Sequence, residues 1–165
     1  PLPTEDRLLF TTVVQNINFN WGGGRVMGNG PYEDTIVNFT GSIYIPESGI
    51  YSFYSPADDG TKLIIDGNMI INDWYDKGGG GSTVQTELSA GSHSITLWYY
   101  ENGGGANVWL YWAKPGYGLE IVPVTDNNSV SRTCVRTGCC ELAISDRSGF
   151  FLSNQFGGLN ALNAK

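Results

Sequence analysis

Short runs of residues that alternate between apolar and polar side chains recur along the chain, and no stretch shows sustained helical spacing. The clearest runs are residues 93–100 (HSITLWYY) and 107–112 (NVWLYW). Because successive side chains of a strand point to opposite faces, Ile95, Leu97 and Val108 are expected to face the core. Further strands are predicted at residues 34–45, 50–55, 61–65, 69–72 and 83–88. This pattern predicts an all-β chain.

Turn signals separate these runs at intervals of about ten residues. Asp66-Gly67 stands between two apolar runs, where a two-residue hairpin needs the positive φ that these residue types adopt. Pro46 to Gly49 and Ser89 to Gly91 mark two more turns. Several short strands with this spacing are typical of an antiparallel sandwich or barrel. We therefore predict an antiparallel β-sandwich of jelly-roll-like architecture.

The character of the sequence changes after Pro123. Residues 124–165 contain several turn-forming clusters and one convincing apolar stretch, Glu141 to Ile144. We expect residues 1–123 to form the sandwich domain and residues 124–165 to form an irregular C-terminal extension. Such an extension is a candidate docking segment for a protein partner or for self-assembly.

Three cysteines, Cys134, Cys139 and Cys140, lie in this extension. Cys134 can pair with Cys139 or with Cys140, and the sequence leaves both pairings open. A disulfide there would favour an oxidising compartment. We expect an extracellular or cell-surface location, the surface of a virion included.

The net charge of −7, from 16 acidic and 9 basic residues, restricts the partners. A surface this negative repels phosphate backbones and anionic lipid. No run approaches the roughly 20 apolar residues that span a bilayer. We therefore expect no nucleic-acid binding and no membrane insertion, whereas cations and neutral ligands suit the surface.

Two neighbouring carboxylates, Asp58 and Asp59, lie between a predicted strand and a predicted hairpin, beside Pro56 and Gly60. In an extended strand their side chains would point to opposite faces. If the backbone bends sharply, as it does at a cis peptide, the two carboxylates converge and repel each other. A hard cation such as calcium, which takes several oxygen ligands, would offset that repulsion. The alternative is a solvated turn without a ligand.

A glycine-rich loop, Gly103 to Gly105, separates the two strongest predicted strands. It exceeds what a tight hairpin needs, and glycine lets backbone carbonyls turn toward one point and a ligand approach closely. Asn102 offers a neutral side-chain oxygen at this loop. Glu101 alternates away from Asn102 but enters the same space if the loop curls. The alternative is a floppy hairpin loop.

Several separated motifs occur in a fixed order: Gly49 to Phe53, Ala57-Asp58-Asp59-Gly60, Leu88 to Gly91, Tyr100 to Ala106, and Leu110-Tyr111-Trp112. Over about residues 5–123 this order resembles the anthrax protective-antigen N-terminal domain family (the PA-fourteen domain). That β-sandwich also occurs in fungal flocculins, bacterial adhesins and glycosidase insertions. The resemblance to the lectin members implies a calcium ion held by an Asp-Asp pair joined by a cis peptide. Its implied ligands are the side chains of Asp58, Asp59 and Asn102 and the backbone carbonyls of Gly104 and Ala106.

The same resemblance implies that the calcium's open positions take two neighbouring hydroxyls of a sugar. Tyr75 and Asp76 are the better candidates for the rim of the sugar pocket, whereas a tryptophan such as Trp74 is more often in a core. The implied sugar-contacting residues are Asp58, Asp59, Trp74, Tyr75, Asp76, Glu101, Asn102, Gly103 and Asn107.

The function implied is a calcium-dependent carbohydrate-binding (lectin) module in cell-surface adhesion, with glycans that carry vicinal hydroxyls as partners. The alternative is a structural or protein-interaction module of a surface fibre, adhesin or virion that binds no sugar. Catalysis is not expected, because adjacent aspartates are too close for the two carboxylates of a glycosidase. His93, the only histidine, is expected to be structural.

Overall fold

The structure is a computed structural model, and it describes residues 7–123, 131–137, 141–145 and 149–153. Within these ranges every regular element is a β-strand, and all paired strands run antiparallel. None of the described residues forms a helix of the length and apolarity that crossing a membrane requires. The prediction of an all-β, antiparallel sandwich is confirmed.

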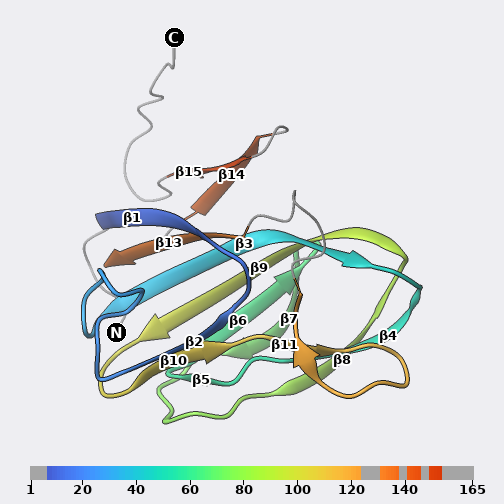
Figure 1. Cartoon of the computed structure of the whole chain (residues 1–165), viewed down its shortest axis with the longest axis horizontal. Helices are drawn as coiled ribbons and strands as arrows, with labels where there is room; N and C mark the ends of the chain where they lie inside the picture. Colours follow the sequence, from blue (N-terminus) through green and yellow to red (C-terminus); the bar gives the residue numbers. More distant parts are fainter. Residues whose placement is uncertain (1–6, 124–130, 138–140, 146–148, 154–165) are drawn as a thin grey trace.

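The sandwich packs one large sheet against a layer made of two smaller sheets (Figure 1). The large sheet has the order β1 (Arg7–Val14), β13 (Ser131–Thr137), β3 (Thr35–Ile45), β9 (Gly91–Glu101), β6 (Gly60–Ile65), β7 (Asn68–Asp73). One small sheet has the order β2 (Asn18–Gly22), β10 (Ala106–Trp109), β5 (Ala57–Asp58). The other has the order β12 (Glu120–Ile121), β11 (Tyr111–Ala113), β4 (Gly49–Tyr54), β8 (Thr83–Leu88). A separate hairpin joins β14 (Glu141–Ser145) to β15 (Gly149–Ser153).

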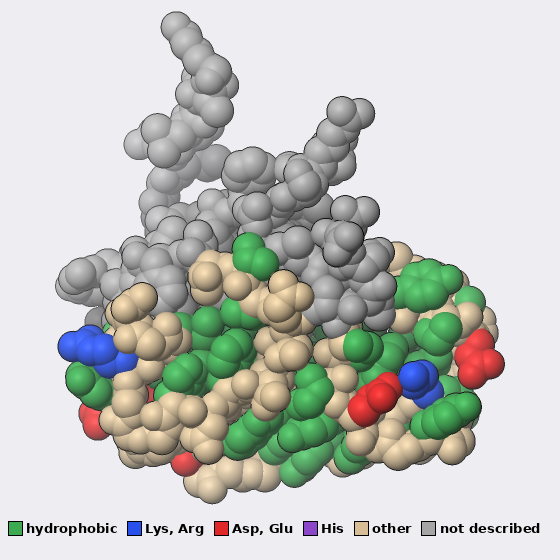
Figure 2. Space-filling model, viewed as in Figure 1, with side chains coloured by type: hydrophobic (Ala, Val, Ile, Leu, Met, Phe, Trp, Pro, Cys, Tyr) green, Lys and Arg blue, Asp and Glu red, His purple; other side chains and the backbone are tan. Residues whose placement is uncertain are grey.

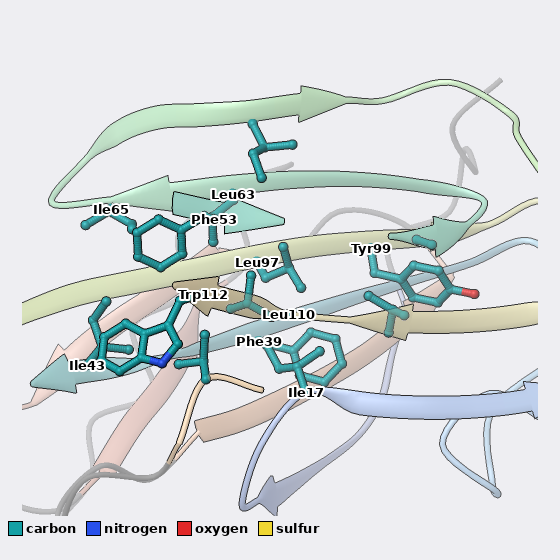
Figure 3. Packing of buried hydrophobic residues seen from close by; sticks show 14 of the residues in the cluster. Ile17, Phe39, Ile43, Phe53, Leu63, Ile65, Leu97, Tyr99, Leu110 and Trp112 are labelled. Carbon is teal, nitrogen blue, oxygen red and sulfur yellow. The ribbon is translucent and has the colours of Figure 1, made fainter. Parts of the chain in front are cut away.

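The core lies between these layers and follows the alternation seen in the sequence (Figure 3). Leu97 and Val108, which the pattern places inward, are fully buried, whereas Ile95 is only partly buried and packs at the edge of the same cluster. Burial of a large apolar side chain stabilises the fold by about 1.5–3 kcal/mol. The largest buried members of the cluster are Trp112, Tyr51, Tyr99, Phe39 and Phe53.

The run at residues 107–112 forms two strands rather than one. β10 belongs to the three-stranded sheet and β11 to the four-stranded sheet, with Leu110 between them. At this break, Leu110 donates its N–H to the carbonyl of Ile17 at 3.0 Å. The period of two continues across the break, which is why the sequence alone does not reveal the change of sheet.

The predicted hairpin at Asp66-Gly67 is present between β6 and β7. Both residues have positive φ, 49° and 77° respectively. Two consecutive residues with positive φ match the twist of the flanking strands, which explains the Asp-Gly pair at this position.

The large sheet includes a strand from beyond residue 123, where the sequence predicts the end of the sandwich domain. β13 lies between β1 and β3 and pairs with both, so part of the expected extension belongs to the sandwich. The apolar stretch from Glu141 to Ile144 lies in β14. Cys134 lies in β13, whereas Cys139 and Cys140 are outside the described residues, so the cysteine pairing stays a prediction.

Candidate cation and carbohydrate site

The chain crosses from the small sheet to the large sheet at Asp58 and Asp59. Asp58 ends β5, where it is paired with Asn107 of β10, and Gly60 begins β6, where it is paired with Tyr100 of β9. The peptide bond between Asp58 and Asp59 is cis. Asp59 is 5% exposed and Asp58 is partly buried. The Asp-Asp pair therefore lies between the two layers of the sandwich.

A third acidic side chain reaches the same point from β9. Glu101 is the last residue of that strand and is 1% exposed. One carboxylate oxygen from each of Asp58, Asp59 and Glu101 lies within 4.8 Å of the others. We call these three residues the carboxylate cluster. Among the described residues, these three are the acidic, cysteine or histidine side chains that lie close enough together to hold a metal ion.

The carboxylate cluster concentrates negative charge in a partly buried space. Burial raises the pKa of Asp58, the neighbouring Asp59 raises it further, and Lys77 opposes both effects. Burial raises the pKa of Glu101 to about 7, against a hydrogen bond from Tyr99, with Asp59 and Asp58 adding to the rise. Negative charges that converge in a partly desolvated space raise each other's pKa. A bound divalent cation would relieve this repulsion.

The loop of residues 74–81 forms one wall of the site. The Lys77 N–H donates to Oδ1 of Asp59 at 3.0 Å, and Asp58 forms a β-bridge with Gly78. At the base of the loop, Asp73 accepts hydrogen bonds from the N–H and the hydroxyl of Ser82, at 2.6 and 2.7 Å. A Cβ atom on Gly81 would lie 2.5 Å from the carbonyl oxygen of Ser55, so only glycine lets the loop pack this closely.

The loop of residues 102–105 forms the opposite wall. The Asn102 N–H donates to Oδ2 of Asp59 at 2.8 Å. The side-chain amide of Asn102 donates to Oδ2 of Asp76 at 3.1 Å, which leaves its Oδ1 free to accept or to ligate. Gly104 has a φ of +102°, and a Cβ atom on Gly105 would lie 3.3 Å from Oδ2 of Asp58. Gly104 and Ala106, whose carbonyls the resemblance implies as ligands, flank Gly105.

The residues expected to contact sugar differ in their exposure. Tyr75 is 57% exposed. Trp74 is partly buried and packs edge-on against Tyr100, with ring centroids 4.6 Å apart. Asp76 accepts a hydrogen bond from the Tyr100 hydroxyl at 2.7 Å and is exposed. Asn102 and Gly103 are also exposed, and Asn107 is partly buried opposite Asp58.

A sequence model of the PA14 domain matches residues 2–126 of this chain. The chain belongs to the PA14 domain family. This confirms the resemblance to the protective-antigen N-terminal domain, and it agrees with the all-β sandwich.

Several proteins of known name or structure are similar to this PA14 domain. It is 31% identical over 121 residues to the anti-sigma-I factor RsgI3 of Acetivibrio thermocellus, covering 71% of this chain and 18% of that protein. A solved anti-sigma factor domain-containing protein superposes with a TM-score of 0.70 at 28% identity, over 76% of this chain and 44% of the other. A PA14 sugar-binding domain from an RTX adhesin superposes with a TM-score of 0.58 at 23% identity, over 67% of this chain and 74% of that domain. The chain thus spans less than half of the first two.

The donor set of this PA14 domain fits a hard divalent cation. The carboxylate cluster supplies three anionic oxygens, and the Oδ1 of Asn102 lies on the adjacent loop. Within the part of the chain that the structure describes, two buried side-chain oxygens at the cluster, Oε1 of Glu101 and Oδ1 of Asn107, have no hydrogen-bond partner. Calcium prefers such an all-oxygen set, whereas zinc prefers nitrogen and sulfur.

Three residues of the site were not foreseen from the sequence of this PA14 domain: Asp73, Lys77 and Tyr99. Their contributions depend on contacts across the loop and the core, which no local pattern encodes. The buried position of Glu101 could have been foreseen, because Leu97, Tyr99 and Glu101 alternate on one face of β9. A side chain as buried as Glu101 is poorly placed to contact a sugar. It is a candidate ligand of the ion rather than a residue of the sugar-binding rim.

Proposed function

We propose that this PA14 domain is a non-catalytic module that binds carbohydrate through a calcium ion. The observation that carries the proposal is the convergence of the carboxylate cluster between two loops, with its oxygens within 4.8 Å of one another. Three acidic side chains so close together are costly unless a cation offsets their charge. The exposed ring of Tyr75 on the adjoining loop adds a surface suited to a sugar.

The residues that would hold the ion are Asp58 and Asp59, joined by the Asn102 side chain and the carbonyls of Gly104 and Ala106 that the family resemblance implies. When bound, calcium supplies coordination positions that vicinal hydroxyls of a sugar can fill in place of water. The chain's backbone fixes the carboxylates in advance. The N–H groups of Lys77 and Asn102 each donate to one oxygen of Asp59 and so hold its orientation.

The rim residues would position the sugar. The ring of Tyr75 offers an apolar face to the C–H groups of a pyranose, and the carboxylate of Asp76 can accept hydrogen bonds from its hydroxyls. Lys77 lies with its Nζ 5.9 Å from the centre of the Tyr75 ring. Affinity for one sugar should be weak, about 10⁻⁵ to 10⁻³ M, because small polar ligands exchange water for similar contacts.

The relatives support carbohydrate as the ligand class and allow two settings. One similar structure is a sugar-binding domain of an adhesin, which favours adhesion at a cell surface. Two others belong to anti-sigma factors, which favours a binding module within a regulatory protein. In both settings we propose an extracellular location. Adhesion in particular would need many copies acting together.

Hydrolysis of the bound sugar is not part of this proposal. A glycosidase places its two carboxylates about 5–10 Å apart on either side of the scissile bond. In the carboxylate cluster one oxygen of each group lies within 4.8 Å of the others, which is closer than this arrangement requires. A cation held there would also keep these groups ionised and unable to act as acids.

The test is a glycan array and a titration with the best hit, in calcium and in a chelator, on the wild type and Asp59→Asn. We expect chelation and D59N each to reduce sugar binding by at least about 100-fold, because the ion loses an anionic ligand. Glu87→Gln, the same loss of charge on an exposed position of β8, is the control and should bind normally. Sugar binding that survives both chelation and D59N would refute the proposal.

The second candidate is a structural or protein-interaction module without sugar binding. It is favoured by the length of the anti-sigma relatives, because the region similar to this chain makes up less than half of each of them. The same array separates the two functions. Calcium binding without any glycan hit would favour the interaction module.

A further inference from the structure

Glu101 occupies an unusual position for an acidic side chain. It shares the inward face of β9 with Leu97 and Tyr99, and 1% of its surface is exposed. Acidic residues are almost never this buried unless they are paired with a positive charge or a metal. The partners of Glu101 therefore decide what it does.

Hydrogen bonds satisfy only a small part of the hydrogen-bonding capacity of the Glu101 carboxylate. The Tyr99 hydroxyl lies 2.9 Å from its Oε2 and 2.7 Å from the carbonyl oxygen of Asp58, so its single proton is shared between two acceptors. Oε1 is buried and is left without a hydrogen-bond partner of good geometry among the described residues, although the nearby backbone N–H of Gly103 helps to hold down the pKa of the carboxylate. An ionised carboxylate can accept about four hydrogen bonds. Glu101 is thus far from satisfied by the protein around it.

A basic side chain does not compensate Glu101 either. Among the described residues, the ion pairs are those of Lys77 with Asp73, His93 with Asp66 and Lys114 with Glu120. Lys77 is the lysine of the site, but its Nζ donates to the Gly80 carbonyl at 2.8 Å and faces Asp73. Glu101 instead faces two further carboxylates, Asp58 and Asp59.

We propose that Glu101 is a direct ligand of the ion, bound through Oε1 from the buried side of the site. The inference rests on the proposed calcium site and extends it by one residue. With Glu101 included, three anionic side chains face two positive charges. Since the number of charged ligands sets calcium affinity, the domain should retain calcium in the absence of sugar.

A second explanation of the same geometry is that Glu101 has only a structural role, with a buried water at Oε1. The two explanations differ in what happens without calcium. A ligand that repels its neighbours when no ion is bound destabilises the calcium-free fold, whereas a structural group stabilises it in both states. The sign of the stability change in chelator therefore separates them.

The experiment uses Glu101→Gln, which removes the charge and keeps the shape and an acceptor for Tyr99. Calcium affinity is measured by calorimetry, and terbium luminescence sensitised by the nearby tyrosines gives a second readout. We expect the calcium dissociation constant to rise at least about tenfold, and the melting temperature in chelator to stay equal or rise. The control is Glu33→Gln, because Glu33 is exposed beside the same loop, with its Cδ 3.9 Å from where a Cβ of Gly103 would lie. E33Q should change the dissociation constant by less than about twofold, since a rim charge contributes little.

The possible results are distinguishable. If E101Q binds calcium as tightly as the wild type while D59N does not, Glu101 is not a ligand and the proposed function stands. If E101Q lowers the melting temperature equally in calcium and in chelator with unchanged affinity, Glu101 is structural. If the wild type binds neither calcium nor terbium, the proposed function and this inference both fail. Should E101Q not fold, Glu101→Asp keeps the charge but withdraws the carboxylate, and unchanged calcium affinity in E101D would overturn the inference.

Discussion

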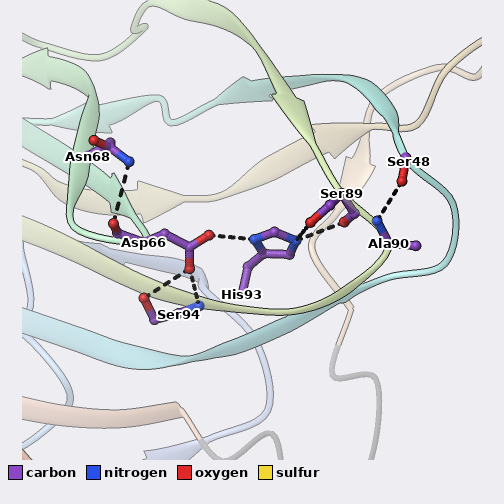
Figure 4. A network of polar contacts seen from close by, with 7 residues as sticks. All are labelled: Ser48, Asp66, Asn68, Ser89, Ala90, His93 and Ser94. Carbon is purple, nitrogen blue, oxygen red and sulfur yellow. Dashed lines mark hydrogen bonds and ion pairs between the residues drawn. The ribbon is translucent and has the colours of Figure 1, made fainter.

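His93 lies at the end of the sandwich where β6 meets the turn before β9, with an acceptor at each ring nitrogen (Figure 4). Nδ1 faces a carboxylate oxygen of Asp66, and Nε2 lies 2.8 Å from the carbonyl oxygen of Ser89. Both nitrogens therefore act as donors, which favours the imidazolium form. The hydroxyl of Ser89 is 3.5 Å from Nε2, but a ring that already donates from both nitrogens has no free base to activate it. The residue is structural, as the sequence predicts.

This contact makes part of the folding stability dependent on pH. The hydrogen bond to Asp66 raises the pKa of His93, and burial opposes the rise. Burial disfavours the charged form of Asp66, but hydrogen bonds from His93 and Ser94 outweigh it and lower the pKa of Asp66. Glu87 lines the same pocket as His93 and Asp66.

We predict that His93→Gln removes a contribution to stability that is present at low pH and absent at high pH. A group with a raised folded pKa stabilises below its unfolded pKa, near 6.5, and this stabilisation is lost as pH rises through the folded pKa. The difference in free energy of unfolding between wild type and H93Q, measured by urea titration in chelator, should be largest below the unfolded pKa of about 6.5 and shrink as the pH rises above it. A difference that stays constant or grows with pH would contradict the ion pair.

Tyr75 offers a second test at the scale of one side chain. We predict that Tyr75→Ala weakens sugar binding about tenfold while calcium affinity stays unchanged, because the ring is exposed and touches the sugar rather than the ion. Tyr44→Ala is the matched control, since Tyr44 is 50% exposed on β3 beside Ser92, far along β9 from Glu101. Both constants are measured by calorimetry. Unchanged sugar binding in Y75A would remove Tyr75 from the rim.

At the scale of single strands, some elements could be predicted from the sequence and others could not. The apolar pattern placed β3, β4, β6, β8 and β9 within a few residues of their bounds, because each buries apolar side chains in or beside the core. β2 and β13 were not predicted. The partly exposed β2 has a weak pattern, and β13 follows a turn-rich segment that resembles a linker. Pairing partners far away in the chain determine such strands, and local pattern does not report them.

β13 gives the clearest prediction at this scale. It pairs with β1 on one side and with β3, over residues 36–40, on the other. We predict that a chain ending at residue 123 melts at least about 5 °C lower than the full chain, since the central sheet loses a strand. The amides of residues 36–40 should also lose protection from hydrogen exchange.

A chain ending at residue 137 is the control for this truncation, because it keeps β13 and lacks the separate β14–β15 hairpin. It should melt close to the full chain. Equal melting temperatures and equal protection in the chains ending at 123 and 137 would show that β13 contributes nothing to the sheet.

At the scale of the whole molecule, the sandwich brings together segments about 40 residues apart in the chain. Asp58 and Asp59 stood out in the sequence as neighbours, and Asn102 as a loop residue, and the fold places Asn102 beside Asp59. What the sequence could not reveal is that Glu101 lies beside Asp58 and Asp59 and that Lys77 holds Asp59, because these contacts depend on how β9 and the 74–81 loop pack against β5. Among the described residues on the face seen in Figure 2, hydrophobic and uncharged groups cover most of the surface, and charged side chains are few and scattered. That distribution suits a neutral ligand better than a charged polymer.

The central claim is that Asp58 and Asp59 share one divalent ion that presents a sugar. A high-resolution crystal structure grown in millimolar calcium with a simple hexose tests it most directly. We predict a single ion in contact with both carboxylates, with two sugar hydroxyls completing its coordination and the ring of Tyr75 beside the sugar. Carboxylates that point apart, with no ion between them in that crystal, would contradict the claim.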